Sequence, residues 1–509
     1  MNRRRFSDAE HAAAPYAEAL RAHAAREPLM FMVPSHAGTR DGLTEDLAEF
    51  FGEQAIAMDI PQLISGIDVG AGSPFEAAER LAADAWGARR TWFLANGSSQ
   101  GNRLAVLAVA GLDAGTDRGR SAPQLIAQRS AHSSLSDGLI LSGLGSRFVT
   151  PSIDHARGIN HGLSVEALEA EFARAAGSGQ RVCAAQIVSP SYFGAVADVA
   201  GLAEVAHRHG VPLIVDAAWG AHFGFHEDLP ESPARLGADV VVTSAHKMGG
   251  SLGQSALIHL GDGPFADALE PLIDRAFRLT QTTSASSLLL GSLDVARRAL
   301  VTRPELLGES IELAEQLRAW VRAHERLSLV SDGFSEFPDI VHIDPLRVAI
   351  DVSGLGLTGY EVRARLADQH GVLLEIATSG AVVAFLGPGK PLDVTRLHAA
   401  IDELAADRLL GGDAPPAAMP PLPGHGQARL TPRDAYFSPT EVVAASAAVG
   451  RISADSLAAY PPGIPNLVPG EVITAETVEF LRAVAASPIG YVRGALDPRV
   501  DAFRVIAER

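Results

Sequence analysis

Short apolar runs alternate with helix-length amphipathic segments along the first half of the chain, and this alternation is the feature that most constrains the fold. Buried strands are predicted at 91–95, 124–128, 184–188, 213–216 and 240–244, with helices at 74–86, 102–111 and 199–209. Such alternation is typical of βαβ units and a mostly parallel sheet covered on both faces. We therefore predict an α/β fold whose ligands bind at the carboxyl ends of the strands.

The second half of the chain predicts smaller units. Helical periodicity at 286–301 and 306–327 precedes a smaller α/β layer with segments at 341–352, 359–368 and 373–385, which a helix at 394–404 closes. A Pro/Gly-rich stretch then has the composition of a stiff linker. The predicted divisions are an N-terminal helical segment (1–30), a large domain (31–300), a small α/β domain (301–410), a linker (411–426) and a C-terminal module (427–509).

Composition excludes several classes of protein. A formal charge of −18 disfavours binding to nucleic acid, and the longest apolar runs are too short for a membrane span. The single cysteine, Cys183, permits neither a disulfide within the chain nor a cysteine-rich metal site. Polar and acidic residues follow the basic start where a signal peptide would be apolar, so we expect a cytoplasmic protein that binds small molecules and no metal.

Lys247 follows the strand predicted at 240–244, within Ser244-Ala-His-Lys-Met-Gly-Gly250. An ammonium group is costly to bury at such a strand end unless it is paired or neutralised. Condensation with an aldehyde as a Schiff base removes that cost, while Ser244 and His246 offer groups able to bind phosphate. The alternative is an exposed loop lysine.

Asp216 ends another hydrophobic strand, and a carboxylate in that position needs a partner. The pyridine nitrogen of pyridoxal phosphate is such a partner, because a neighbouring carboxylate keeps the ring protonated and able to accept electrons. The small side chain of Ala218 leaves room for a flat ring. The alternative is that Asp216 caps the start of a helix.

Two further clusters follow predicted strands. The run Asn96-Gly-Ser-Ser-Gln-Gly-Asn102 precedes an apolar helix, and its Gly97, Ser98 and Ser99 offer donors for a phosphate group, although a turn with a helix cap explains them almost as well. They match neither the P-loop nor the dinucleotide-binding glycine pattern. His132 follows the strand at 124–128, where its ring is placed to stack on an aromatic cofactor unless it is merely structural. Together the four clusters meet the needs of one ligand, pyridoxal 5'-phosphate.

The sequence resembles the Orn/Lys/Arg decarboxylase family, which has the aspartate-aminotransferase fold, over nearly its whole length. The matching segments include Phe93–Ser99, Pro190–Gly194, Asp216–His226, Ser244–Lys247, Gln281–Ser284, Tyr460–Pro465 and Pro469–Glu471. The resemblance implies a fold type I, pyridoxal-phosphate-dependent enzyme with a small α/β domain and a decarboxylase-type C-terminal module.

The resemblance also implies a role for each matching residue. Lys247 would form the Schiff base, Asp216 would pair with the pyridinium, and His132 would stack on the ring. Trp219 would lie beside the cofactor, with Ser98, Ser99, Ser244 and His246 at its phosphate. Thr282 would contact the phosphate from a neighbouring subunit, which implies a homodimer or higher oligomer with interfacial sites. The alternative for that segment is capping of a helix by Thr283 or Ser284.

Departures from the family pattern fall near the expected substrate. The chain has Pro34-Ser-His-Ala37, His132-Ser-Ser134 and Asp216-Ala-Ala218 where members typically have Pro-Gly-His-Lys, His-Lys-Ser and Asp-Glu-Ala. None of these removes a group that the cofactor needs.

We therefore predict decarboxylation of a basic or polar amino acid, with arginine, lysine and ornithine, the precursors of polyamines, as leading candidates. Lys247 or His246 would return a proton to Cα. Another pyridoxal-phosphate reaction, such as transamination, elimination or oxygen-dependent deamination, is the alternative within the enzyme class, and a non-catalytic regulatory homologue is the alternative outside it.

Overall fold

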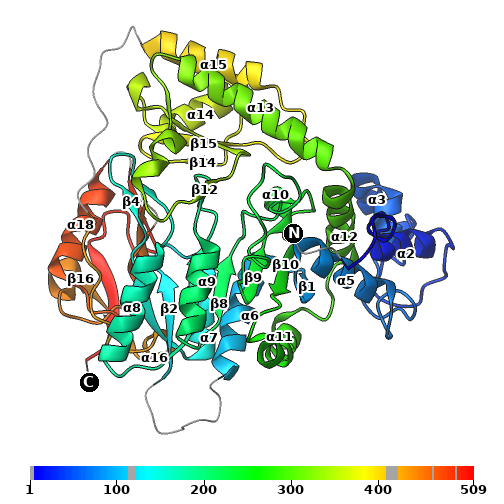
Figure 1. The fold of residues 1–509 in the computed structure, drawn as a ribbon, viewed down its shortest axis with the longest axis horizontal. Helices are drawn as coiled ribbons and strands as arrows, with labels where there is room; N and C mark the ends of the chain where they lie inside the picture. The colour runs from blue at the N-terminus through cyan, green and yellow to red at the C-terminus, as the bar shows by residue number, and fades with distance from the viewer. Residues whose placement is uncertain (1–4, 113–121, 409–421, 461–463, 488–489, 509) are drawn as a thin grey trace. The chain divides into compact units, whose positions relative to one another are not determined.

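The computed structural model describes residues 5–112, 122–408, 422–460, 464–487 and 490–508 (Figure 1). The chain forms two compact units that interleave along the sequence. The first comprises Met1–Ala108 and Ile214–Leu307, and the second comprises Val109–Leu213 and Gly308–Arg509. No helix among the described residues is long and apolar enough to span a membrane.

The first unit contains four hydrogen-bonded strands with buried side chains on both faces. Their order is β1 (Arg90–Leu94), β10 (Ala256–Leu260), β9 (Val240–Thr243) and β8 (Leu213–Asp216). β8 and β9 are parallel, as predicted, whereas β10 was not predicted and pairs antiparallel with both of its neighbours. Because two antiparallel steps restore the direction, β1 runs the same way as β9, and their carboxyl ends lie at one edge.

Helices of the first unit begin and end where local signals place them. α5 (Pro74–Trp86) has the predicted bounds: the Ser73 hydroxyl accepts from the Glu76 N–H, and Gly87 ends the helix with φ +72°. α12 (Ser287–Thr302) agrees within one residue. α6 (Gly97–Leu112) starts five residues earlier than predicted, at a glycine with φ +71°. The remaining helices are α1 (Asp8–His11), α2 (Pro15–Ala24), α3 (Glu45–Phe51), α4 (Glu53–Met58), α10 (Ala245–Met248) and α11 (Ala266–Thr280).

The second unit contains three parallel strands in the order β6 (Val182–Val188), β2 (Gln124–Gln128) and β3 (Gly145–Val149). The intervening helices are α7 (Ser133–Ser142), α8 (Val165–Gly177) and α9 (Val199–Arg208). The parallel pairing confirms the predicted α/β architecture in this unit.

A second sheet in the same unit forms the small α/β layer (Figure 1). Its strands are all antiparallel, in the order β11 (Ser328–Leu329), β13 (Arg347–Asp351), β15 (Ala381–Phe385) and β14 (Ile376–Ala377). The apolar sides of α13 (Pro304–Ala323), α14 (Gly359–His370) and α15 (Val394–Arg408) share one core with this sheet. The segment predicted as one run over 373–385 is two strands joined by a turn.

The C-terminal module of the second unit has its own apolar core. Its elements are α16 (Pro432–Phe437), β16 (Thr440–Ala444), α17 (Ala445–Ala448), β17 (Leu457–Tyr460), β18 (Ile464–Leu467), α18 (Ala475–Ala486), β19 (Tyr491–Arg493) and β20 (Ala502–Ile506). Most of the predicted linker, 411–421, lies outside the described residues, so the predicted domain boundaries stay predictions.

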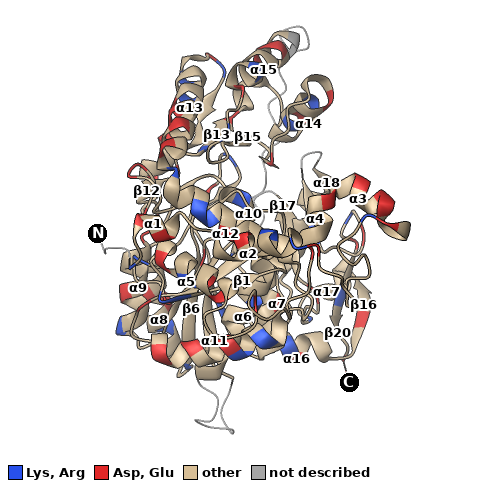
Figure 2. Cartoon of the chain, turned by 90° about the vertical axis from the view of Figure 1, so that its right-hand side faces the viewer, with Lys and Arg blue, Asp and Glu red and all other residues tan. Residues whose placement is uncertain are grey.

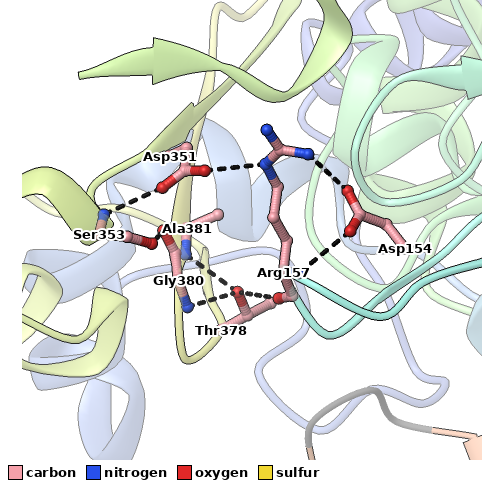
Figure 3. Close-up of polar contacts among 7 residues, drawn as sticks. All are labelled: Asp154, Arg157, Asp351, Ser353, Thr378, Gly380 and Ala381. Atoms are coloured by element: carbon pink, nitrogen blue, oxygen red, sulfur yellow. Dashed lines mark hydrogen bonds and ion pairs between the residues drawn. The ribbon is translucent and has the colours of Figure 1, made fainter. Parts of the chain in front are cut away.

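Arg157 joins two parts of the second unit (Figure 3). It lies between β4 (Ile153–Asp154) and β5 (Ile159–Asn160), and its guanidinium donates to Asp154 Oδ2 at 2.7 Å and to Asp351 Oδ2 at 2.8 Å. Asp351 ends β13 of the small sheet, so one cation connects that sheet to the β4–β5 hairpin. The Thr378 hydroxyl donates to the Arg157 carbonyl at 3.4 Å and strengthens this junction.

We expect Arg157→Ala to lower the free energy of unfolding by about 1–3 kcal/mol, because two partly buried carboxylates lose charged donors. Arg322→Ala is a matched control, since its ion pair with Asp332 is half exposed on both sides and should contribute at most about 1 kcal/mol. Thermal unfolding followed by circular dichroism measures both variants. Equal shifts in Tm would contradict a bracing role for Arg157.

Candidate active site

Three of the four polar clusters predicted to form the site belong to the first unit. They follow β1, β8 and β9, whose carboxyl ends point the same way, so the topology brings these clusters to one edge. The fourth cluster, around His132, belongs to the second unit.

The Ser98 and Ser244 hydroxyls meet at the ends of β1 and β9. Ser244 Oγ donates to Ser98 Oγ at 2.7 Å. Since α6 begins at Gly97, Ser98 and Ser99 lie in its first turn, where backbone N–H groups have no partner within the helix. Hydroxyls and N–H donors at the positive end of a 16-residue helix form an arrangement suited to a phosphate group.

Asp216 is buried, with only 4% of its surface exposed. Its Oδ2 accepts from Asn102 Nδ2 at 2.8 Å, and its Oδ1 accepts from the Ala218 N–H at 3.1 Å. Among the residues that the structure describes, no cationic side chain forms an ion pair with it. The chain turns after Asp216 without starting a helix, so the helix-cap alternative is wrong.

Lys247 lies in the short helix α10, directly after β9. Its Nζ is 4.2 Å from the centre of the Trp219 ring, and the side chain is half-buried, so the exposed-loop alternative is wrong. The neighbouring His246 has Nδ1 at 2.8 Å from the Ser255 carbonyl. Because a carbonyl only accepts, Nδ1 must carry the proton, and Nε2 of the neutral ring is left as an acceptor.

His132 is exposed and occupies the N-cap position of α7. Its Nδ1 accepts from the Ser134 N–H at 3.2 Å and lies 2.8 Å from Ser134 Oγ, which places the ring proton of the neutral form on Nε2. These contacts fix the start of α7 and leave the ring exposed. A stacking role for His132 stays a prediction.

Thr282 is also exposed, in the segment that precedes α12. Its hydroxyl accepts from the Ser284 N–H at 3.3 Å. Ser286 is the N-cap of α12 and makes no capping hydrogen bond with its side chain. Thr283 and Ser284 therefore do not cap the helix, and the capping alternative is wrong.

Sequence reasoning missed two residues that support this edge. Asn102 ends the 96–102 cluster and lies four residues after Ser98, a helical spacing that puts both on one face of α6. That spacing was a usable signal. His259 was missed because its strand, β10, was not predicted.

His259 joins three strands beneath the loops of the site. Its two ring nitrogens lie 2.8 Å from Thr91 Oγ1 on β1 and 3.1 Å from Thr243 Oγ1 on β9, and the ring is fully buried. Burial lowers the pKa of His259 to about 3. The neutral ring thus bonds to the residue that immediately precedes Ser244.

Comparisons with known proteins identify one family, by two family models and by relatives that cover nearly the whole chain. The family model for the Orn/Lys/Arg decarboxylase major domain matches residues 14–336, and that for the C-terminal domain matches residues 425–488. An arginine decarboxylase of Bacillus subtilis is 32% identical over 504 residues, covering 97% of this chain and 98% of the relative. An arginine decarboxylase of Bacillus anthracis is 32% identical over 498 residues, covering 97% of each.

Solved structures support the fold. The lysine decarboxylase LdcF of Francisella novicida superimposes with a TM-score of 0.81 at 18% identity, covering 98% of this chain and 82% of that one. Lysine decarboxylase A of Pseudomonas aeruginosa superimposes with a TM-score of 0.79 at 20% identity, covering 98% and 81%.

We expect acid to destabilise the protein partly through His259. The unfolded chain binds a proton at this ring below about pH 6.5, whereas the native ring stays neutral down to a pKa of about 3. Stability therefore falls as pH falls between these values, by up to about 1.4 kcal/mol per pH unit.

The test is urea unfolding at pH 7 and pH 5.5. His259→Gln should lose about 1 kcal/mol less than the wild type between the two. His342→Gln, at an exposed histidine, is the control and should behave as the wild type. An unchanged pH dependence in His259→Gln would contradict the account.

Proposed function

Because the chain belongs to the Orn/Lys/Arg decarboxylase family and is therefore an amino-acid decarboxylase, we propose that it acts on arginine with pyridoxal phosphate held at Lys247. The observation that supports the cofactor most is the buried Asp216 carboxylate, which has a neutral amide donor but no cationic partner among the described residues. A cytoplasmic location stays a prediction.

The residues of the first unit fit the cofactor group by group. Asp216 offers a carboxylate to a protonated ring nitrogen, and Ala218 beside it adds no bulk. Ser98, Ser99 and Ser244 would bind the phosphate through hydroxyls and first-turn N–H groups. Lys247 would bind the aldehyde carbon through its amine.

Bound pyridoxal phosphate supplies a protonated ring that takes up the electron pair released when the carboxylate leaves. Asp216 would hold the proton on the ring nitrogen, and Asn102 fixes the carboxylate in place through its bond to Oδ2. Trp219 packs against Lys247 and limits where the amine can lie.

Return of a proton to Cα is assigned to Lys247. Of the two candidates, His246 already donates its Nδ1–H to the Ser255 carbonyl. The Lys247 ammonium has protons to give and stands beside Trp219 at the proposed reaction centre.

Arginine is favoured over lysine and ornithine by the relatives. Arginine decarboxylases are 32% identical to this chain over nearly their whole length, whereas the lysine decarboxylase LdcA of Pseudomonas aeruginosa is 23% identical and 75% covered.

Lysine labelling tests the cofactor assignment, because Lys247 and Lys390 are the only lysines in the sequence. We expect borohydride to fix a pyridoxyl group on the Lys247 peptide, detected by mass spectrometry. Lys247→Ala should abolish both label and turnover, and Lys390→Ala should keep both. Label on Lys390, or near-normal turnover by Lys247→Ala, would contradict the assignment.

A substrate panel tests the reaction. We expect the purified enzyme to release CO₂ from arginine with a kcat/KM at least about tenfold above that for lysine or ornithine, a difference of about 1.4 kcal/mol. A preference for another amino acid would overturn the choice of arginine. Formation of a keto acid or ammonia without release of CO₂ would indicate another pyridoxal-phosphate reaction, such as transamination, elimination or oxygen-dependent deamination.

The surface of the first unit supports the proposal of a homodimer. Large apolar side chains are exposed along 29–69, among them Phe31 at 93% and Phe50 at 81%, and Leu279 near Thr282 is 76% exposed. Large apolar side chains exposed within one segment are typical of an interface. Acidic positions on α3 accompany them (Figure 2). We propose that a second copy of the chain covers this surface and that Thr282 reaches its partner's site.

Co-expression tests the shared site. Lys247→Ala and Thr282→Glu should each be inactive alone, yet their heterodimer should recover one site that pairs Lys247 of one chain with Thr282 of the other. Lys247→Ala with Ser98→Glu is the control, and it should not recover because both residues belong to one chain's site. Failure of the first pair, with heterodimers shown by tagged co-purification, would remove Thr282 from the partner's site.

A further inference from the structure

A buried ion pair connects β2 to the C-terminal module within the second unit. Arg129, the residue after β2, has 2% of its side chain exposed, and Glu471 has 3%. The guanidinium donates to both Glu471 carboxylate oxygens, with Nη2 to Oε2 at 2.8 Å. It is a two-point contact of the kind that fixes orientation as well as distance.

Backbone carbonyls of the module complete the coordination of Arg129. Nε donates to the Pro465 carbonyl at 2.7 Å, and Nη2 donates to the Asn466 carbonyl at 3.2 Å. The guanidinium carbon also lies 4.7 Å from the centre of the Phe148 ring on β3. The side chain is thus held from the module on one side and from the sheet on the other.

Glu471 is itself fixed inside the module. Its Oε2 accepts from the Val468 N–H at 3.1 Å, and its carbonyl accepts from the Ser453 N–H at 2.8 Å. The C-terminal module therefore sets the position of the Glu471 carboxylate, and through it the position of the Arg129 guanidinium.

Only Ser130 and Ala131 separate Arg129 from His132. Ser130 Oγ accepts from Gln128 Nε2 at 2.7 Å, the Ala131 N–H bonds to the Gln128 carbonyl at 3.1 Å, and His132 then caps α7. Because only two residues intervene, we expect a shift of the Arg129 backbone to reach the His132 backbone.

From these contacts we infer that Glu471 is a positioning residue for His132: through Arg129, the C-terminal module sets where the His132 ring lies. The inference rests on the proposed function together with the prediction, drawn from the family resemblance, that His132 stacks on the cofactor ring. If so, the Pro469-Gly-Glu471 motif contributes to cofactor binding in addition to anchoring the C-terminal module.

The test compares holoenzymes of the full chain by two readouts, the visible circular dichroism band of the bound cofactor and the rate of cofactor release on dilution. Glu471→Gln should weaken the band and speed release by about tenfold, within the range of coupling in one network. Arg433→Ala is the matched control, because Arg433 joins the same module to the far end of α7 through the Leu141 carbonyl. It should change neither readout.

A double variant separates positioning from anchoring. In a His132→Ala background, Glu471→Gln should cause no further change, because the ring it positions is gone. If it still speeds release by the same factor there, or if Glu471→Gln lowers only Tm, the inference is wrong. Should Glu471→Gln fail to fold, Arg129→Lys keeps the charge but loses the two-point contact, and the same pattern is expected.

The outcomes also distinguish a failure of the inference from a failure of the proposed function. A His132→Ala variant with normal band and release would remove His132 from the proposed cofactor site and overturn the inference with it. If His132→Ala changes both readouts and neither Glu471→Gln nor Arg129→Lys does, the proposed function stands and only the inference fails.

Discussion

The carboxylate of Asp216, buried at the end of β8, is the constraint on which the site depends. A charge removed from water is costly unless it is hydrogen-bonded or paired. Asn102 and the Ala218 N–H supply hydrogen bonds, but both donors are neutral. A cationic ring nitrogen would supply the missing charge, and the hydroxyls, helix start and amine at this edge of the sheet would hold the rest of the proposed ligand.

The parallel part of the fold was predictable because buried strands and capped helices leave strong local signals. Ser73, Pro74 and Gly87 fix both ends of α5, and continuous apolar runs mark β2, β8 and β9. β10 escaped prediction because an antiparallel strand next to a loop lacks the alternation with helices that identified the others. The start of α6 was predicted too late. The helix begins at a glycine with positive φ, and the apolar residues from which it was predicted start only after its first turn.

The site was predictable where the residue type alone indicates the chemistry. It was less predictable where a residue's role depends on a contact that forms only in the folded chain. Lys247, Asp216 and Ser98 stand out by residue type and by their place after strands, and the structure gathers them within the first unit. Nothing in the sequence pairs Arg129 with Glu471, because 342 positions separate them and only the folded module brings them together. The charge of Asp216 is likewise visible in the sequence, but its burial and its neutral donors are not.

We propose that Asp216 keeps the ring nitrogen of pyridoxal phosphate protonated. The most direct measurement is the nitrogen-15 chemical shift of ring-labelled cofactor bound to the wild type and to Asp216→Asn, recorded across the pH range in which the enzyme is stable. The account predicts the shift of a protonated pyridine in the wild type at every pH, and that of a neutral pyridine in Asp216→Asn. A neutral ring nitrogen in the wild type, or the same protonated shift in both proteins, would contradict it.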